Sequence, residues 1–182
     1  LNDLKKNNLG NIFFLNRNKI KNIIDSNSLV ENYKIFKKYP SSKNINIQKT
    51  DFLAKINKNG KILNLGSNRK FSENKHLNEN LPFIFGRIDI DEFMKLKHNL
   101  DLSNISYDQI KNLYFFPSKR WDLELKNNIL MKLPEDYSIE TINYLFDFLK
   151  NENLKNITII DGRVNNQIIL NDWRKRFWYL SK

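Results

Sequence analysis

The last third of the chain places strand-forming segments on both sides of one amphipathic helix, and this order constrains the fold more than any other feature. Residues 120–135 predict a β-hairpin, because apolar and polar side chains alternate with the two-residue period of a half-buried strand. Residues 138–150 predict a helix with one apolar face. Residues 157–170 predict two further strands. A sheet of this kind has a free edge, and a free edge can recognise another chain by accepting its strand.

The first sixty residues predict helices followed by strands. Residues 17–26 carry isoleucines at helical spacing, which indicates a helix with one buried stripe. Residues 30–39 and 45–56 alternate apolar and polar side chains as strands do. The pair Asn59-Gly60 is typical of a type I′ hairpin turn, since both residue types accept positive φ angles.

The middle of the chain is less regular. Residues 81–86 predict an extended segment, and Pro82 favours the edge or entry of a sheet over its centre. Asp89 or Asp91 can cap the helix that follows. Residues 103–116 fit either a strand or a helix.

Charge and composition exclude several classes of protein. Thirty-one Lys and Arg residues against twenty Asp and Glu residues give a net charge of +11, but the lysines are scattered and indicate loose association with anionic partners rather than a site. The chain has no cysteine, which excludes disulfides, thiolate metal sites and cysteine nucleophiles. Neither His76 nor His98 has a second ligand at metal-binding spacing, so no metal is expected.

No motif of a known catalytic site occurs in the sequence. Phosphate-binding loops, nucleophile elbows and zinc-protease helices are all missing, so we expect no enzyme activity, no cofactor and no small-molecule substrate. Asp122 and Glu124 share one face of a predicted strand, and a solvated face is favoured over an acid–base pair. Trp121 points to the opposite face and is expected in the core.

Three charged residues lie beside the predicted last strands. Asp161 and Arg163 are two residues apart, share a face and are expected to form an ion pair that Arg120 can join. One interpretation is a surface salt bridge that contributes under ~1 kcal/mol. The other is a charged rim that fixes the register of an incoming strand.

The C-terminal tail, Trp173–Lys182, mixes aromatic and basic side chains. Such a tail can pack on its own sheet, lie on an anionic membrane or stack on nucleic acid, and the first two are favoured. Stacking on nucleic acid defines the alternative function, a basic nucleic-acid-binding protein.

Several short motifs resemble, in order, the FtsQ/DivIB family of cell-division proteins in its alphaproteobacterial form. The motifs are Arg120-Trp121-Asp122-Leu123, Leu133-Pro134-Glu135 and Ile160-Asp161-Gly162-Arg163-Val164-Asn165-Asn166-Gln167. Residues 36–47 are similar to the final strands of the family's POTRA domain, and residues 81–86 to the start of its second domain.

The resemblance implies an α+β chain of two domains. An N-terminally incomplete POTRA domain of helices and strands is expected over residues 1–56. A mostly antiparallel β domain with flanking helices is expected over residues 57–182. The family consists of non-catalytic divisome scaffolds of the bacterial inner membrane, crossing it once. On this resemblance a membrane helix is expected before Leu1, and the present chain is expected in the periplasm at the septum.

The resemblance also implies the partners and the site. The expected partners are FtsB and FtsL, with FtsW, FtsI and FtsK as others, and no nucleic acid. The FtsB strand would add to a C-terminal edge strand. The implied contact residues are Arg120, Arg163, Val164, Asn165, Asn166, Gln167, Ile168, Ile169 and Leu170.

The chain departs from the family pattern at two positions. Gly162 stands where leucine is usual, which is expected to loosen or bulge the strand. Asn128 replaces a turn glycine, which asparagine can do because it accepts the left-handed conformation. A POTRA-bearing outer-membrane assembly factor is a further alternative, but the sequence has no long series of barrel strands.

Overall fold

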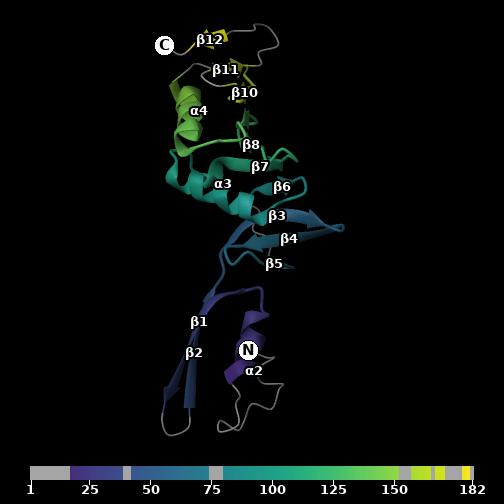
Figure 1. The fold of residues 1–182 in the computed structure, drawn as a ribbon, viewed down its shortest axis with the longest axis vertical. Coiled ribbons are helices and arrows are strands. Elements are labelled where there is room, and N and C mark those ends of the chain that lie inside the picture. Colours follow the sequence, from purple (N-terminus) through teal and green to yellow (C-terminus); the bar gives the residue numbers. More distant parts are fainter. Residues whose placement is uncertain are drawn as a thin grey trace. The chain divides into compact units, whose positions relative to one another are not determined.

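The computed structural model describes residues 17–38, 42–73, 80–151, 157–164, 167–170 and 178–180. These residues form helices and a large, mostly antiparallel sheet, which confirms the α+β class (Figure 1). The elements are α2 (Arg17–Asp25), β1 (Val30–Lys38), β2 (Ser42–Lys49), β3 (Phe52–Lys58), β4 (Lys61–Gly66), β5 (Phe71–Ser72), β6 (Phe83–Phe85), α3 (Ile90–Leu102), the short 3-10 helix η2 (Tyr107–Gln109), β7 (Ile110–Phe115), β8 (Trp121–Leu125), β9 (Leu130–Lys132), α4 (Ile139–Asn151), β10 (Ile159–Asp161), β11 (Gln167–Leu170) and β12 (Trp178–Leu180).

The chain divides into two compact units. The smaller unit consists of Leu1–Leu53 and Leu63–Lys75, and the larger unit of Ala54–Ile62 and His76–Lys182. The expected family domains, residues 1–56 and 57–182, stay a prediction. None of the helices in the described parts of the chain is long and apolar enough to cross a membrane.

In the smaller unit, β1 and β2 form an antiparallel hairpin, and α2 contributes the buried Ile24. The predicted helix at residues 17–26 is therefore confirmed. The strand predicted over residues 45–56 is interrupted at Thr50, which is 8% exposed. The Thr50 hydroxyl donates a hydrogen bond to the Glu31 carboxylate (2.9 Å), which also accepts one from the Ser67 hydroxyl (2.7 Å). These bonds hold Thr50 in the connection between β2 and β3, where the buried hydroxyl has its partners.

The sheet has the strand order β12-β11-β10-β9-β8-β7-β6-β3-β4-β5. The hairpin predicted within residues 120–135 is confirmed as β8 and β9, and Asn128 in its turn has the expected positive φ, 64°. The helix predicted at residues 138–150 is α4, which packs beside α3 (Figure 1). Residues 103–116, which fitted either structure, form a short 3-10 helix followed by β7.

The prediction that the Pro82 segment lies at a sheet edge is wrong. Strand β6 lies between β3 and β7 and is parallel to both. Pro82 precedes the strand, so its missing N–H group is not needed there, while its carbonyl accepts a hydrogen bond from the Lys55 N–H (2.9 Å). Proline is therefore compatible with a central strand at this position.

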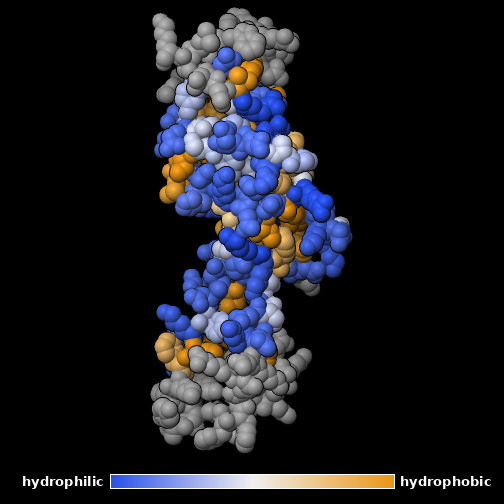
Figure 2. Space-filling model, in the orientation of Figure 1, coloured by the Kyte–Doolittle hydropathy of each residue, from blue (hydrophilic) through white to orange (hydrophobic). Residues whose placement is uncertain are grey.

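The core of the larger unit lies between the sheet and the two helices. Trp121 is fully buried, as predicted, and its ring centroid lies 4.6 Å from that of Phe115 and 6.3 Å from that of Phe93 on α3. The apolar residues that remain exposed include Phe85, Leu102 and Tyr144. On the face seen in Figure 2, apolar surface forms small patches separated by hydrophilic residues.

Candidate functional site

A row of charged residues crosses three neighbouring strands of the larger unit, on the sheet face opposite Trp121. In the strand register, Asp122 of β8 lies opposite Lys132 of β9, and Lys132 lies opposite Asp161 of β10. Arg120 and Arg163 extend this row at its two ends through Asp122 and Asp161. We refer to these five residues, Arg120, Asp122, Lys132, Asp161 and Arg163, as the charge row. It contains three cations and two anions, which favours an acidic partner.

Arg120 is held at one end of the charge row by two contacts. Its Nε donates a hydrogen bond to Asp122 Oδ1 (3.3 Å), and its guanidinium lies 4.3 Å from the ring centroid of Phe116. Both contacts involve groups on or beside β8, so they fix the guanidinium relative to the sheet.

The prediction that Asp122 lies on a solvated face is wrong, since the residue is only 4% exposed. Burial raises the pKa of the Asp122 carboxyl, while the charges of Arg120, Lys132 and Arg163 act in the opposite direction. The Asp122 carboxylate therefore interacts electrostatically with both Arg120 and Arg163, the two arginines that the sequence suggested as site residues.

Arg163 forms hydrogen bonds with the Asp161 carboxylate through both its side chain and its backbone. Its Nε donates to Asp161 Oδ1 (2.7 Å), its second guanidinium nitrogen contacts Asp161 Oδ2, and its backbone N–H also donates to Oδ1 (3.1 Å). Burial by itself would raise the pKa of Asp161, but these bonds hold it below its ordinary value, and they raise the pKa of Arg163. The predicted ion pair is confirmed, and its bidentate form fixes the guanidinium at the end of β10.

The remaining predicted contact residues follow Arg163 along the chain. Val164 is 45% exposed, whereas Ile168 and Leu170 of β11 are 2% and 6% exposed because they face the core. Gln167 and Ile169 are half-buried. Asn165 and Asn166 lie outside the described residues.

The prediction that Val164–Leu170 forms the free edge of the sheet is wrong. Strand β11 pairs with β10 on one side and with β12 on the other, so the outermost strand at this border is β12 (Figure 1). The backbone of Trp178–Leu180 pairs with β11, which agrees with packing on the sheet, one of the two arrangements favoured for the tail. The residues Trp178–Leu180 have a high propensity for strands, which allows this pairing. No pattern in the sequence indicated which strand they would pair with. The rest of the tail lies outside the described residues.

Gly162 has a role that the sequence did not indicate. A β-carbon added at Gly162 would lie 2.7 Å from Leu145 Cδ1, so the glycine leaves space for this side chain of α4. The absence of a side chain therefore permits close packing of the helix next to Arg163.

Glu124 carries the strongest electrostatic effect on this face. Its carboxylate accepts hydrogen bonds from Tyr114 Oη (2.7 Å), Asn112 Nδ2 (2.8 Å) and Lys111 Nζ (2.8 Å). The bonds from Asn112, Lys111 and Tyr114 lower the pKa of Glu124 to about 2, while burial acts in the opposite direction. The donors come from the adjacent β7, and only the register of β7 on β8 brings them to this carboxylate.

Replacing Tyr114 by phenylalanine is expected to raise the pKa of Glu124, because one of its three donors is lost. A carboxyl whose pKa is lowered by folding adds stability above its unfolded pKa, near 4.5, and this stability is lost as the pH falls toward about 2. The variant should therefore lose less stability between pH 5 and 2 than the parent protein does. Carboxyl carbon shifts in an NMR titration and urea unfolding at several pH values measure both effects. Tyr144→Phe, at a half-exposed tyrosine of α4, is the control; equal titration of Glu124 in both variants would refute the assignment.

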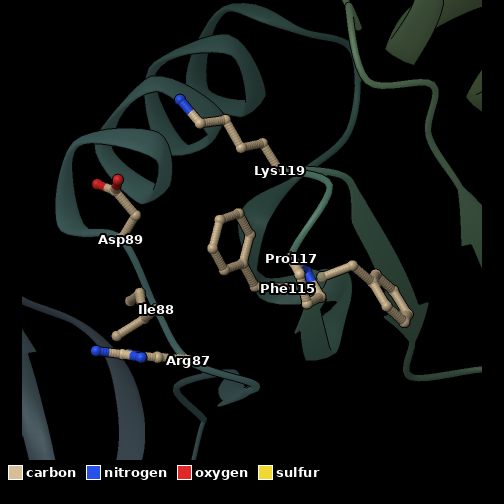
Figure 3. A pocket seen from close by; sticks show the side chains of 7 residues that line it. Arg87, Ile88, Asp89, Phe115, Pro117 and Lys119 are labelled. Atoms are coloured by element: carbon tan, nitrogen blue, oxygen red, sulfur yellow. The ribbon is translucent and has the colours of Figure 1, made fainter.

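A separate pocket of about 570 Å³ opens beside the turn between β7 and β8. It is lined by Arg87, Ile88, Asp89, Phe115, Phe116, Pro117 and Lys119. In Figure 3, the ring of Phe115 points into the space between Asp89 and Lys119. Asp89 already caps α3 by accepting from the Asp91 N–H, and Lys119 Nζ lies 3.4 Å from Glu92 Oε1. The Asp89 carboxylate and the Lys119 ammonium group in the pocket lining are thus already engaged within the protein.

The described residues contain no group of three or more His, Cys, Asp or Glu side chains that could hold a metal ion. In the charge row, Arg120 pairs with Asp122 and Arg163 pairs with Asp161, so both carboxylates are engaged by arginines. This arrangement suits recognition of a charged partner better than transfer of a proton to a substrate.

A comparison with known protein families finds a match over most of the described sheet region. The family model described as "Cell division protein FtsQ/DivIB, C-terminal" matches residues 46–163, well over half of the chain. No curated protein matches the chain. The matched region includes the whole charge row and ends at Arg163, so β11 and β12 lie beyond it.

Proposed function

The chain belongs to the FtsQ/DivIB family of cell-division proteins, and from this we propose that it is a non-catalytic scaffold of the divisome that binds the FtsB–FtsL pair. The proposed mode of binding is addition of a partner strand along Val164–Leu170, on the side of β11 where β12 lies. Arg163 and Arg120 supply charge complementarity to an acidic segment of the partner.

The observation that supports this proposal most is the position of Arg163 at the end of β10. The side chain is 39% exposed, yet three contacts with Asp161 fix its orientation. A fixed arginine loses little conformational entropy when a partner carboxylate binds, so it can set the register of an incoming strand. The adjacent Val164 is exposed and can contact the same strand.

The remaining partners and the location follow from the family by analogy. We propose FtsW, FtsI and FtsK as further partners. We also propose that a membrane helix outside this sequence anchors the protein in the bacterial inner membrane, with the present residues in the periplasm at the septum.

Replacing Arg163 by alanine is expected to weaken binding of the FtsB–FtsL pair at least about tenfold, which corresponds to about 1.4 kcal/mol. Isothermal titration calorimetry with the purified pair measures this change. The matched control is Arg87→Ala, at an exposed arginine of the same unit that lies outside the charge row. The double variant Asp161→Asn with Arg163→Ala removes the unpaired carboxylate that the single change leaves behind.

A second variant tests the strand itself. Ile168→Pro removes one backbone N–H of β11 and distorts the ladder, so binding should fall further, while circular dichroism checks that the rest of the unit stays folded. Undiminished binding by Arg163→Ala, the double variant and Ile168→Pro would refute the proposed mode. A nucleic-acid-binding protein would instead retain single strands in a gel shift, with an affinity that falls steeply with salt.

A further inference from the structure

The side of β11 that a partner strand would use is already occupied by the protein's own tail. Strand β12 is antiparallel to β11, with Gln167 opposite Leu180, Ile168 opposite Tyr179 and Ile169 opposite Trp178. On its other side β11 pairs with β10. Both ladder sides of β11 therefore have a strand beside them, and no second chain can pair with β11 while β12 is in place.

We propose that β12 is an internal competitor that closes the strand-accepting side of β11 and must leave before a partner strand can bind there. This inference rests on the proposed function, because it assumes that partner strands add to β11. It extends that function by giving the site a closed and an open state within the same chain.

The contacts of β11 show why it can remain in place when β12 leaves. Ile168 and Leu170 are buried in the core, and Leu170 and Ile169 pair with Ile160 and Asp161 of β10. The pairing with β10 does not involve β12. The acceptor strand is thus held by the rest of the larger unit, and opening does not require the sheet to unfold.

Strand β12 differs from β11 in having a neighbour on one side only. The strand has three residues, it has a single neighbour, and it forms the border of the sheet. Strands of five or six residues are more usual, and short edge strands add little stability. Strand β12 pairs with Gln167, Ile168 and Ile169, so a partner segment that pairs with all four residues of β11 would form a longer ladder.

The connection between the strands decides how strongly β12 competes. Residues 171–177 join β11 to β12, and a short linker gives a tethered segment an effective concentration on the order of mM. If β12 is closed in about nine molecules out of ten, only a tenth of the molecules can accept a partner, and the apparent Kd rises about tenfold.

The test compares the full chain with a variant that ends at Leu170, using the purified FtsB–FtsL pair as the probe. The shortened variant should bind about tenfold more tightly. Trp178→Pro with Tyr179→Pro in the full chain should act in the same direction, because adjacent N–H groups point to opposite sides of a strand and one of the two faces β11. Ser181→Pro, just beyond β12, is the matched control. Unchanged or weaker binding by both the shortened and the double variant would overturn the inference.

Hydrogen exchange provides a readout that does not depend on the partner. Amides of Gln167–Leu170 that point toward β12 should exchange faster in the shortened variant, while those that point toward β10 should not change. Equal exchange in both proteins would overturn the inference even if the partner binds. Faster exchange together with no binding of the FtsB–FtsL pair by either protein would refute the proposed function. The same result would still support the proposal that β12 closes β11.

Discussion

Replacing Trp121 by alanine is expected to lower the free energy of unfolding of the larger unit by about 3–5 kcal/mol, the range for removing a large aromatic side chain from a core. Trp121 is fully buried and contacts Phe115 and Phe93, so its loss opens a cavity between the sheet and α3. Urea unfolding followed by tryptophan fluorescence and circular dichroism measures the change.

Two further variants make this prediction specific. Trp121→Phe should cost less than the alanine variant, since it keeps most of the volume and removes a buried indole N–H that has no hydrogen-bond partner among the described residues. Tyr144→Ala, on the exposed side of α4, should change the free energy by no more than about 0.5 kcal/mol. A loss below about 1 kcal/mol for Trp121→Ala would show that the side chain is not in the core.

Replacing Gly86 by alanine is expected to lower the free energy of unfolding by about 2–6 kcal/mol, because backbone strain and overpacking combine. Gly86 has a φ of +103°, which a side chain disfavours. A β-carbon there would lie 2.2 Å from the carbonyl oxygen of Phe115. That oxygen belongs to the backbone of β7, so no change of rotamer can relieve the contact, and the β6–β7 pairing must move.

The matched control for this substitution is Gly60→Ala in the same unit. Gly60 also has a positive φ, +79°, but a β-carbon there would have no atom within 4 Å. Only the conformational cost of about 1–2 kcal/mol is then expected. Thermal unfolding of both variants separates strain from contact, and equal losses of stability would contradict the role assigned to the Phe115 carbonyl.

Sequence patterns predicted the elements whose side chains repeat regularly. The alternation at Trp121, Leu123 and Leu125 located β8 and its buried face, and the helical spacing after Ser138 located α4. The motif around Asp161 and Arg163 indicated an ion pair that is present. These features depend on neighbours within a few residues along the chain, so they can be recognised from the sequence.

The burial of polar residues could not be predicted in the same way. The charged groups around Asp122 include Lys132 of β9 and Arg163, which follows β10, and both lie far from Asp122 along the chain. Glu124 has its low pKa because the register of β7 places three donors beside it. The alternation of side chains along β8 identified the sheet face on which Asp122 and Glu124 lie. It could not identify the residues of other strands that lie on the same face.

The sequence by itself determined the α+β class, the location of the C-terminal hairpin and helix, the core position of Trp121 and the membership in a cell-division family. Only the tertiary structure decided the order of the strands. It places β6 inside the sheet despite Pro82 and brings the residues of the charge row together from three neighbouring strands. It also pairs β12 with the outer side of β11. The physical reason is that periodicity reports which side of a segment is buried. Strand order and register depend on backbone hydrogen bonds between distant segments, and those bonds use groups that nearly every residue carries.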